Sequence, residues 1–205
     1  MNKWVARAVI NCLQDPRYQV TYQDPVHRPY ENNLNHCVAE VLEHGYDYWL
    51  TMDDDNPPIR NPLDMVRHDL DIVGFPTPVW HSEVRGDRPW YFNALDFVNS
   101  ADGGGWKPAE LTGGLQEVDA IGSGCMLIAY RVLKLMDKPL FMREYDEMGR
   151  VVRGHDYLFS QKAKAAGFKI WVDGDYPCRH FVGVELLEVI ESFDAFHSGG
   201  RMNGV

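Results

Sequence analysis

The stretch YDYWLTMDDDNPP, residues 46–58, is the part of the sequence that most constrains the fold. Residues 47–52 are too continuously apolar for a strand with one face in water, so they predict a buried strand covered on both sides. Parallel strands between two layers of helices have this pattern. We therefore expect a parallel strand that runs directly into three adjacent carboxylates, residues 53–55, and is stopped by a turn containing two prolines.

Helices and strands are expected to alternate along the rest of the chain. Apolar residues recur at helical spacing in residues 4–12 and 34–42, and Gly45 is placed to end the second helix. Residues 18–23 are rich in β-forming residues, and residues 71–75 have the character of another buried strand. This βαβ rhythm predicts one α/β domain spanning residues 1–205, with a mostly parallel sheet flanked by helices.

The composition limits the partners that the chain is expected to have. The formal net charge is -10, and hydrophobic residues make up 45% of the sequence, which is enough to bury one core. An acidic chain is not broadly attracted to phosphate backbones or anionic membranes, since these need clustered lysine and arginine. The four cysteines are widely spaced, and no secretory leader or apolar run of about 20 residues is recognisable. We expect a cytoplasmic protein without a membrane partner.

The three carboxylates fall where α/β proteins bind their ligands. In open α/β sheets, ligands bind beyond the carboxyl ends of the strands, which is the predicted position of Asp53, Asp54 and Asp55. Adjacent carboxylates repel one another, and a hard divalent cation is the simplest partner that offsets the repulsion. A solvated acidic turn is the alternative. The position after a buried strand favours the metal site.

Several segments together resemble the GT-A glycosyltransferases, especially the family-2-like enzymes. YDYWLTMDDDNP is similar to their strand and DxD motif, and VDAIGSGCMLIAYRVL to their strand and loop at the sugar and acceptor site. GHDYLFSQKAKAAGFKIWVD is similar to their "ED" segment, and CRHFVG to their late histidine motif. The ordered set covers roughly residues 32–183. The resemblance implies a GT-A, Rossmann-like fold.

The resemblance also implies a function and a metal site. It implies a metal-dependent transfer of a sugar from a nucleoside-diphosphate sugar, with a UDP-sugar expected, to a hydroxyl acceptor. Asp53 would lie near the ribose and belong to the metal site, while Asp55 and His180 would bind Mn²⁺ or Mg²⁺ and Asp54 would point away. The cation would neutralise the charge that grows on the departing nucleoside diphosphate. For His180 alone, the alternative is a polar residue that merely ends a strand.

Two further segments receive roles from the resemblance. Asp156 would be the general base that deprotonates the acceptor, which implies an inverting reaction, although an acidic residue there also suits a helix N-terminus. The family usually has Glu before this Asp, whereas this chain has His155. Gly122, Ser123 and Gly124 would bring the backbone close to the donor sugar, or would simply form a tight turn between strands.

One departure from the family concerns the first strand, which normally grips the nucleobase and is not recognisable here. A partner subunit or an oligomer could supply it, the fold could be a minimal variant, or the sequence could begin late. Residues 21–33 are the remaining candidates for nucleoside contacts, with Asp24 and Arg28 as their polar groups. The acceptor is expected to be a polysaccharide, a protein or a modified DNA base.

One stretch of the sequence is rich in glycine, and two functions other than glycosyl transfer are also considered. Residues 99–114 are predicted to be a loop that closes over the site as a lid or is a plain surface excursion, and Trp106 and Trp80 are candidates to stack on a sugar. The other functions are a catalytically weak sugar-nucleotide-binding or assembly subunit, and a metal-dependent nucleotidyltransferase.

Overall fold

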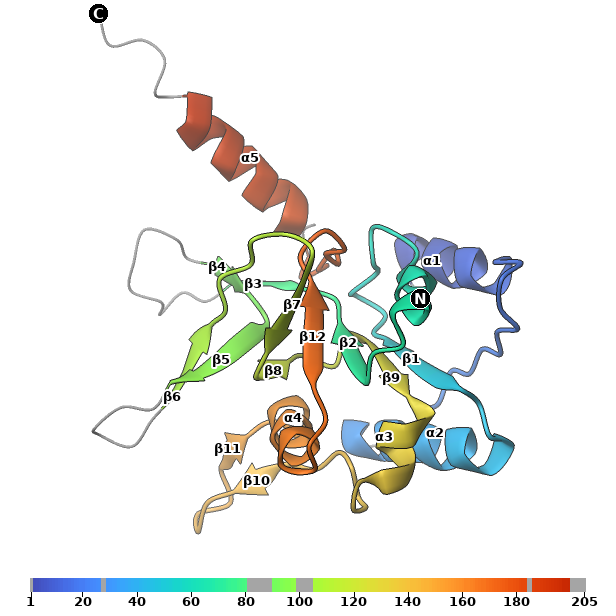
Figure 1. Ribbon diagram of the computed structural model, residues 1–205. Helices are drawn as coiled ribbons and strands as arrows, with labels where there is room; N and C mark the ends of the chain where they lie inside the picture. The colour runs from blue at the N-terminus through green and yellow to red at the C-terminus, as the bar shows by residue number, and fades with distance from the viewer. Residues whose placement is uncertain (1, 27–28, 81–89, 99–104, 184–185, 200–205) are drawn as a thin grey trace, which may run out of the picture.

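The centre of the protein is a five-stranded mixed sheet. The computed structural model describes residues 2–26, 29–80, 90–98, 105–183 and 186–199, and for 194–199 the backbone alone. The strand order is β1-β9-β2-β12-β7 (Figure 1). The bounds of these strands are Tyr48–Met52 for β1, Cys125–Ala129 for β9, Ile72–Gly74 for β2, Ile170–Asp173 for β12 and Leu115–Val118 for β7.

The prediction of a mostly parallel sheet is wrong. β1 and β2 both pair antiparallel with β9, β7 pairs antiparallel with β12, and only β2 and β12 pair parallel among the described strands of this sheet. β1 is an edge strand, and Thr51 is its one fully buried residue. Its side chains pack against the hydrophobic clusters on both faces of the sheet while staying partly exposed. Both faces of the strand are therefore apolar, and this pattern does not indicate whether the strand is parallel or antiparallel. The α/β class itself is correct.

Three smaller sheets lie beside the central one. β3 (Pro78–Trp80) pairs with β4 (Trp90–Phe92), and β10 (Glu144–Tyr145) pairs with β11 (Val151–Arg153). The third sheet has the order β6-β5-β8, with the bounds Gly105–Pro108, Ala94–Val98 and Ala120–Ile121. The predicted loop at residues 99–114 is therefore partly a strand, and its residues 99–104 lie outside the described part of the chain.

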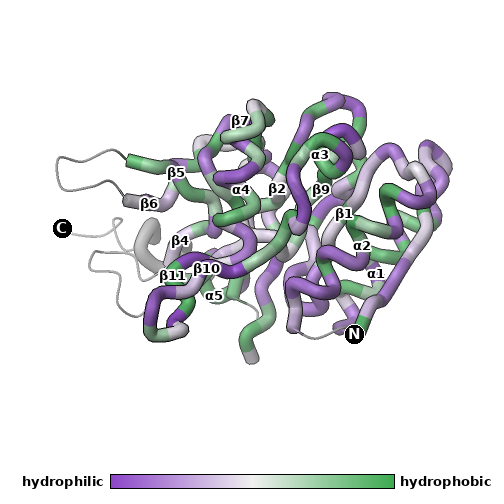
Figure 2. The backbone as a smooth tube through the Cα atoms, turned by 90° about the horizontal axis from the view of Figure 1, so that it is seen from below, coloured by the Kyte–Doolittle hydropathy of each residue, from purple (hydrophilic) through white to green (hydrophobic). Residues whose placement is uncertain are grey.

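The predicted helices near the N-terminus are confirmed. The helices are α1 (Lys3–Leu13), α2 (Tyr30–His44), α3 (Tyr130–Leu135), α4 (His155–Ala165), α5 (Leu186–Gly199) and the 3₁₀ helix η1 (Pro62–His68). Gly45 ends α2 in the left-handed conformation, with φ of 71°, as predicted. Along α1 and α2, hydrophobic and hydrophilic residues alternate at helical spacing (Figure 2).

The strand predicted at residues 18–23 is absent from the described structure, where residues 19–26 have no regular secondary structure. Tyr22 in this segment is 46% exposed. β-forming side chains favour a strand when they can pack on a half-buried surface, and an exposed segment lacks that support.

The two faces of the central sheet carry two hydrophobic clusters. The larger one packs α2, α3 and α4 against the sheet, with Met126 and Ile128 of β9 fully buried in it. The smaller one packs η1 on the other face, where Met65 meets Phe75 and Leu127. Among the described residues, no helix has the length and the apolar character needed to cross a membrane.

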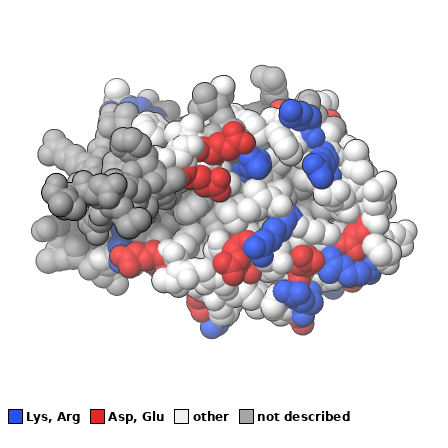
Figure 3. Space-filling model, turned by 90° about the horizontal axis from the view of Figure 1, so that it is seen from above, with Lys and Arg blue, Asp and Glu red and all other residues white. Residues whose placement is uncertain are grey.

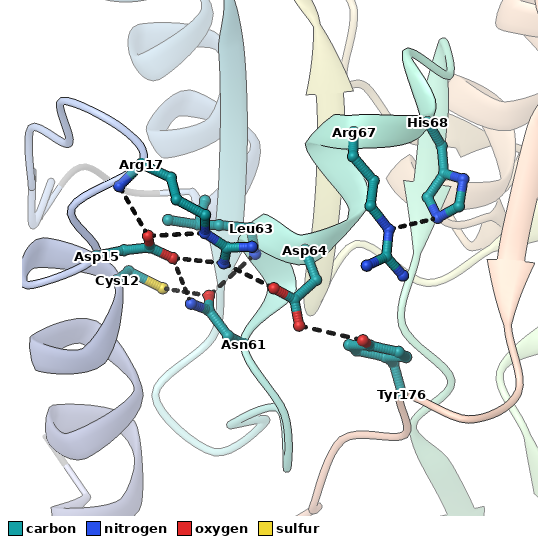
Figure 4. A network of polar contacts seen from close by, with 9 residues as sticks. All are labelled: Cys12, Asp15, Arg17, Asn61, Leu63, Asp64, Arg67, His68 and Tyr176. Atoms are coloured by element: carbon teal, nitrogen blue, oxygen red, sulfur yellow. Dashed lines mark hydrogen bonds and ion pairs between the residues drawn. The ribbon is translucent and has the colours of Figure 1, made fainter.

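A polar network attaches the end of α1 to η1 (Figure 4). Arg17 donates to both carboxylate oxygens of Asp15 and also reaches Asp64, at 2.6 Å. Asn61 donates to Asp15 at 2.6 Å, and its oxygen caps η1 by accepting from the N–H of Leu63. The hydrogen bonds from Arg17 hold the pKa of Asp15 well below its usual range. This network holds α1 next to the turn that follows the three aspartates.

A glycine in β2 tests the packing of the sheet. A Cβ on Gly74 would overlap the side chain of Ile121, which is fully buried and cannot move into solvent. We expect Gly74→Ala to lower the free energy of unfolding in urea by roughly 1–3 kcal/mol, because overpacking displaces the core. Gly105→Ala is the matched control, since a Cβ there meets no atom within 4 Å. Equal stability of the two variants would contradict this account of the packing.

Candidate functional site

The end of β1 is held against the turn between β8 and β9. The N–H of Asp53 donates to the carbonyl of Gly124 at 2.7 Å, and the Thr51 hydroxyl donates to the carbonyl of Ser123 at 2.7 Å. These bonds continue the antiparallel pairing of β1 with β9 beyond the strands. Two of the predicted site segments, the three aspartates and residues 122–124, are therefore brought together.

Asp53 is a half-buried carboxylate at this junction. Its carboxylate accepts a hydrogen bond from the Tyr30 hydroxyl, at the start of α2. Burial raises the pKa of Asp53, with smaller contributions in the same direction from Asp55 and Asp54, while the Tyr30 hydrogen bond and His155 act to lower it. Burial and the Asp53 charge also raise the pKa of Tyr30, so its hydroxyl keeps its proton. The surroundings of Asp53 thus disfavour its negative charge, and a bound cation would offset this.

Asp55 lies beside His180. The N–H of Phe181 donates to the carbonyl of Asp55 at 3.0 Å, so the late histidine segment runs along the aspartate turn. His180 Nε2 is 3.8 Å from a carboxylate oxygen of Asp55, and His180 Nδ1 is 2.7 Å from the carbonyl of Pro78. A carbonyl can only accept, so Nδ1 carries a proton and donates to Pro78, and Nε2 faces Asp55. Burial raises the pKa of Asp55, and the neighbouring histidine lowers it.

The donor set suits a divalent cation, although the predicted three ligands do not form a ready cluster. Among the described residues, no three His, Cys, Asp or Glu side chains are close enough together to hold a metal ion. Asp55 and His180 are adjacent, Asp53 lies next to them along the chain, and Asp54 is exposed. Carboxylate oxygen and an Nδ1-anchored imidazole are ligands that Mn²⁺ accepts. The ligand set Asp53, Asp55 and His180 stays a prediction.

A buried amide beside Asp53 was missed in the sequence. Asn56 is 8% exposed, and its Oδ1 has no hydrogen-bond partner among the described residues. A Cβ on Gly124 would overlap the Asn56 side chain, and one on Gly122 would overlap Asn93. The two glycines therefore let a pair of amides approach the turn. The tight-turn interpretation of residues 122–124 fits this packing, and their contact with a donor sugar stays a prediction.

The start of α4 meets the same junction from another side. Asp156 lies in the first turn of α4, where its carboxylate accepts from the N–H of Tyr157 at 2.9 Å. His155 Nε2 is 3.1 Å from the Ser123 hydroxyl, and the His155 ring lies 5.2 Å from the ring of Tyr30. The predicted base and the residue before it are thus linked to the turn 122–124 and to α2.

Glu31 is a second residue that the sequence did not identify. It is buried in the first turn of α2, with its carboxylate paired with Arg143 and 3.4 Å from His155 Nδ1. His155 Nε2 and the Ser123 hydroxyl are within hydrogen-bond distance, and the tautomer of the ring decides which of the two donates. In the sequence, an acidic residue in the first turn of a helix indicates only a favourable dipole contact.

The predicted nucleoside contacts are not built into the described site. Asp24 is exposed in the irregular segment before α2, and Arg28 lies outside the described residues. β1 pairs with β9 on one side and with no described strand on the other. This edge is where a further strand would have to join the sheet.

Comparison with known proteins supports the fold and leaves the activity open. No protein-family model and no curated protein matches the chain. Among solved structures, the crystal structure of A197 from STIV is similar, with a TM-score of 0.53 and 17% sequence identity, over 85% of this chain and 78% of that one. The two proteins share a fold over most of their length. At this identity the likeness concerns the fold alone, and each residue's role rests on the geometry above.

Proposed function

We propose that this protein is a metal-dependent glycosyltransferase that moves a sugar from a nucleoside-diphosphate sugar, with a UDP-sugar expected, to a hydroxyl acceptor. The observation that carries the proposal is the junction at the end of β1. There Asp53, the turn 122–124 and the start of α4 meet, although they are far apart in sequence. The resemblance of the ordered sequence motifs to GT-A glycosyltransferases supports it as well.

The donor would bind at the aspartate end of the junction. Asp55 and His180 would hold Mn²⁺ or Mg²⁺, with Asp53 completing the set or contacting the ribose. The cation would supply neutralising charge for the departing nucleoside diphosphate. Asn56 offers a buried, unpartnered oxygen to a hydroxyl or a metal-bound group beside Asp53. Ser123 and its two glycines would face the sugar, and Asp24 and Arg28 are the proposed polar contacts of the nucleoside.

The acceptor would be deprotonated at the start of α4. Asp156 is half-buried, and its carboxylate uses one oxygen on the N–H of Tyr157, which leaves lone pairs for an acceptor hydroxyl. Direct attack assisted by one base gives inversion at the anomeric carbon. His155 is the competing base, because Glu31 orients its ring and its Nε2 already faces a hydroxyl, that of Ser123.

Product analysis tests the proposal. The purified chain is incubated with Mn²⁺ and a panel of UDP-, GDP-, ADP- and dTDP-sugars, and the nucleotide products are separated by chromatography. We expect release of the nucleoside diphosphate from at least one of these sugars. Sugar transfer and donor hydrolysis both break the bond between sugar and diphosphate. Release of pyrophosphate from a nucleoside triphosphate and a sugar phosphate would instead identify a nucleotidyltransferase. Failure to release any diphosphate across the panel would argue against the proposal.

The metal ligands are tested by binding. We expect Asp55→Asn and His180→Gln each to weaken Mn²⁺ affinity in the presence of UDP by roughly tenfold or more, as measured by isothermal titration calorimetry. Asp54→Asn is the matched control, since the Asp54 side chain is exposed and this substitution removes the same charge from the same turn. If Asp54→Asn lost as much affinity as Asp55→Asn, the effect would be general electrostatics and the proposed ligand set would be wrong.

The base is tested by transfer kinetics. We expect Asp156→Asn to slow transfer by roughly 10²-fold or more, because the amide keeps the contact with the Tyr157 N–H but cannot accept a proton. Donor affinity should remain near that of the parent. His155→Gln is compared in parallel. A larger loss in His155→Gln together with near-normal transfer by Asp156→Asn would move the base role to His155.

A further inference from the structure

A groove of about 570 Å³ is lined by residues of the β5–β6 hairpin, of β11 and of the start of α4. Figure 1 shows where these elements lie in the fold. Its volume is in the range of small-ligand sites. The side chains that line it include Phe97, Trp106, Val152, Arg153, Tyr157 and Gln161. Neither the three aspartates nor the turn 122–124 belongs to its lining, so this is a separate subsite.

Three aromatic rings line the groove, two from the β5–β6 hairpin and one from α4. The rings of Trp106 and Tyr157 are nearly parallel, with centroids 6.1 Å apart and an interplanar angle of 21°. Phe97 meets Trp106 edge to face at 5.3 Å and is 42% exposed. These contacts hold the rings in fixed orientations on two elements, β5–β6 and α4. A ligand would therefore meet a preformed aromatic surface.

The rest of the lining combines exposed apolar groups with polar groups. Val151 and Val152 of β11 are 49% and 56% exposed. Arg153 Nη1 donates to the Gln161 side-chain oxygen at 2.6 Å and is 3.1 Å from the Glu144 carboxylate. A guanidinium can only donate, so Arg153 bonds to the side-chain oxygen of Gln161. The side-chain N–H groups of Gln161 are not used in this bond. The groove thus offers donors next to apolar surface.

The charge of the groove is largely compensated. Arg153 is the one cation among its described lining residues, and Glu144 pairs with it. On the face of the described residues that Figure 3 shows, acidic and basic side chains are interspersed. A nucleic-acid strand needs several unpaired cations for its phosphates. The lining therefore favours an uncharged ligand over a polynucleotide.

The groove adjoins the proposed base. Gly154 and Tyr157 line it, and Asp156 lies between them in the first turn of α4. The Asp156 carboxylate is also near enough to Tyr157 to contribute, after burial, to the raised pKa of this tyrosine. A ligand that rests on Trp106 and Tyr157 would extend toward Asp156.

We propose that this groove binds a neutral oligosaccharide, which serves as the acceptor; the acceptor role rests on the proposed function, the binding does not. A pyranose ring has an apolar C–H face that packs on aromatic rings and hydroxyls around its edge that need hydrogen-bond partners. The groove supplies both, in Trp106 and Phe97 for the face and in Arg153 and Gln161 for the hydroxyls.

Binding without donor or metal tests the inference. The full chain is titrated with maltohexaose, cellohexaose and chitohexaose at up to millimolar concentration, with a ten-residue oligothymidine and an unrelated peptide as other ligand classes, and intrinsic tryptophan fluorescence and ligand-observed NMR are measured. We expect saturable binding of at least one oligosaccharide. Trp106→Ala should weaken it by about tenfold or more, and Trp106→Phe less, since a ring remains.

Leu135→Ala is the control, because Leu135 is a large apolar residue of α3 that is 69% exposed but does not line the groove, so this variant should bind like the parent. Circular dichroism checks that each variant is folded, and Trp106→Phe keeps the test valid if the alanine variant is not. The inference is overturned if none of the three oligosaccharides binds, if binding is unaffected by both Trp106 variants, or if oligothymidine or peptide binds more tightly.

The two proposals can fail separately. Release of nucleoside diphosphate by the parent protein without oligosaccharide binding would overturn the groove and leave the glycosyltransferase. Oligosaccharide binding that depends on Trp106, in a parent protein that cleaves none of the nucleotide sugars, would overturn the glycosyltransferase and leave a carbohydrate-binding groove.

Discussion

The antiparallel pairing of β1 with β9 is the constraint on which the site depends. It continues past the strand ends through the bond from the Asp53 N–H to the Gly124 carbonyl, and Thr51 reinforces it through Ser123. A register shift of one residue would turn Asp53 away from Tyr30, since neighbouring side chains point to opposite faces of a strand. The position of the first carboxylate is therefore fixed by backbone hydrogen bonds rather than by its own side-chain contacts.

Around this junction the chain buries more polar groups than a purely structural turn needs. Tyr30, Asp53, His155 and Glu31 form a continuous series of contacts, and Arg143 balances its far end. Partial burial disfavours the charge of Asp53 and the neighbouring aspartates add repulsion, while the Tyr30 hydrogen bond and His155 act against both. Such a site lowers the stability of the free protein and gains from any ligand that brings positive charge or hydrogen bonds. This combination is expected where binding, rather than packing, has determined the residues.

The sequence predicted what depends on local spacing. The helices at the N-terminus and the Gly45 cap follow from periodicity and from local capping rules. Strand direction could not be predicted, because the partner of β1 lies more than 70 residues further along the chain. Glu31 and Asn56 were missed for the same reason: each acquires its role from residues remote in sequence, Arg143 with His155 and Gly124 respectively.

The carboxylate junction and the aromatic groove are built on different parts of the fold. The carboxylates and the turn 122–124 lie at the end of the central sheet, where a shift of any strand would disturb the core. The aromatic groove is instead built from the β5–β6 and β10–β11 hairpins, which pair outside that sheet. Because surface hairpins tolerate change better than core strands do, we expect substitutions in the groove to cost less stability than substitutions at the carboxylate junction. α4 connects the two parts, since Asp156 and Tyr157 are neighbours in its first turn and face different partners.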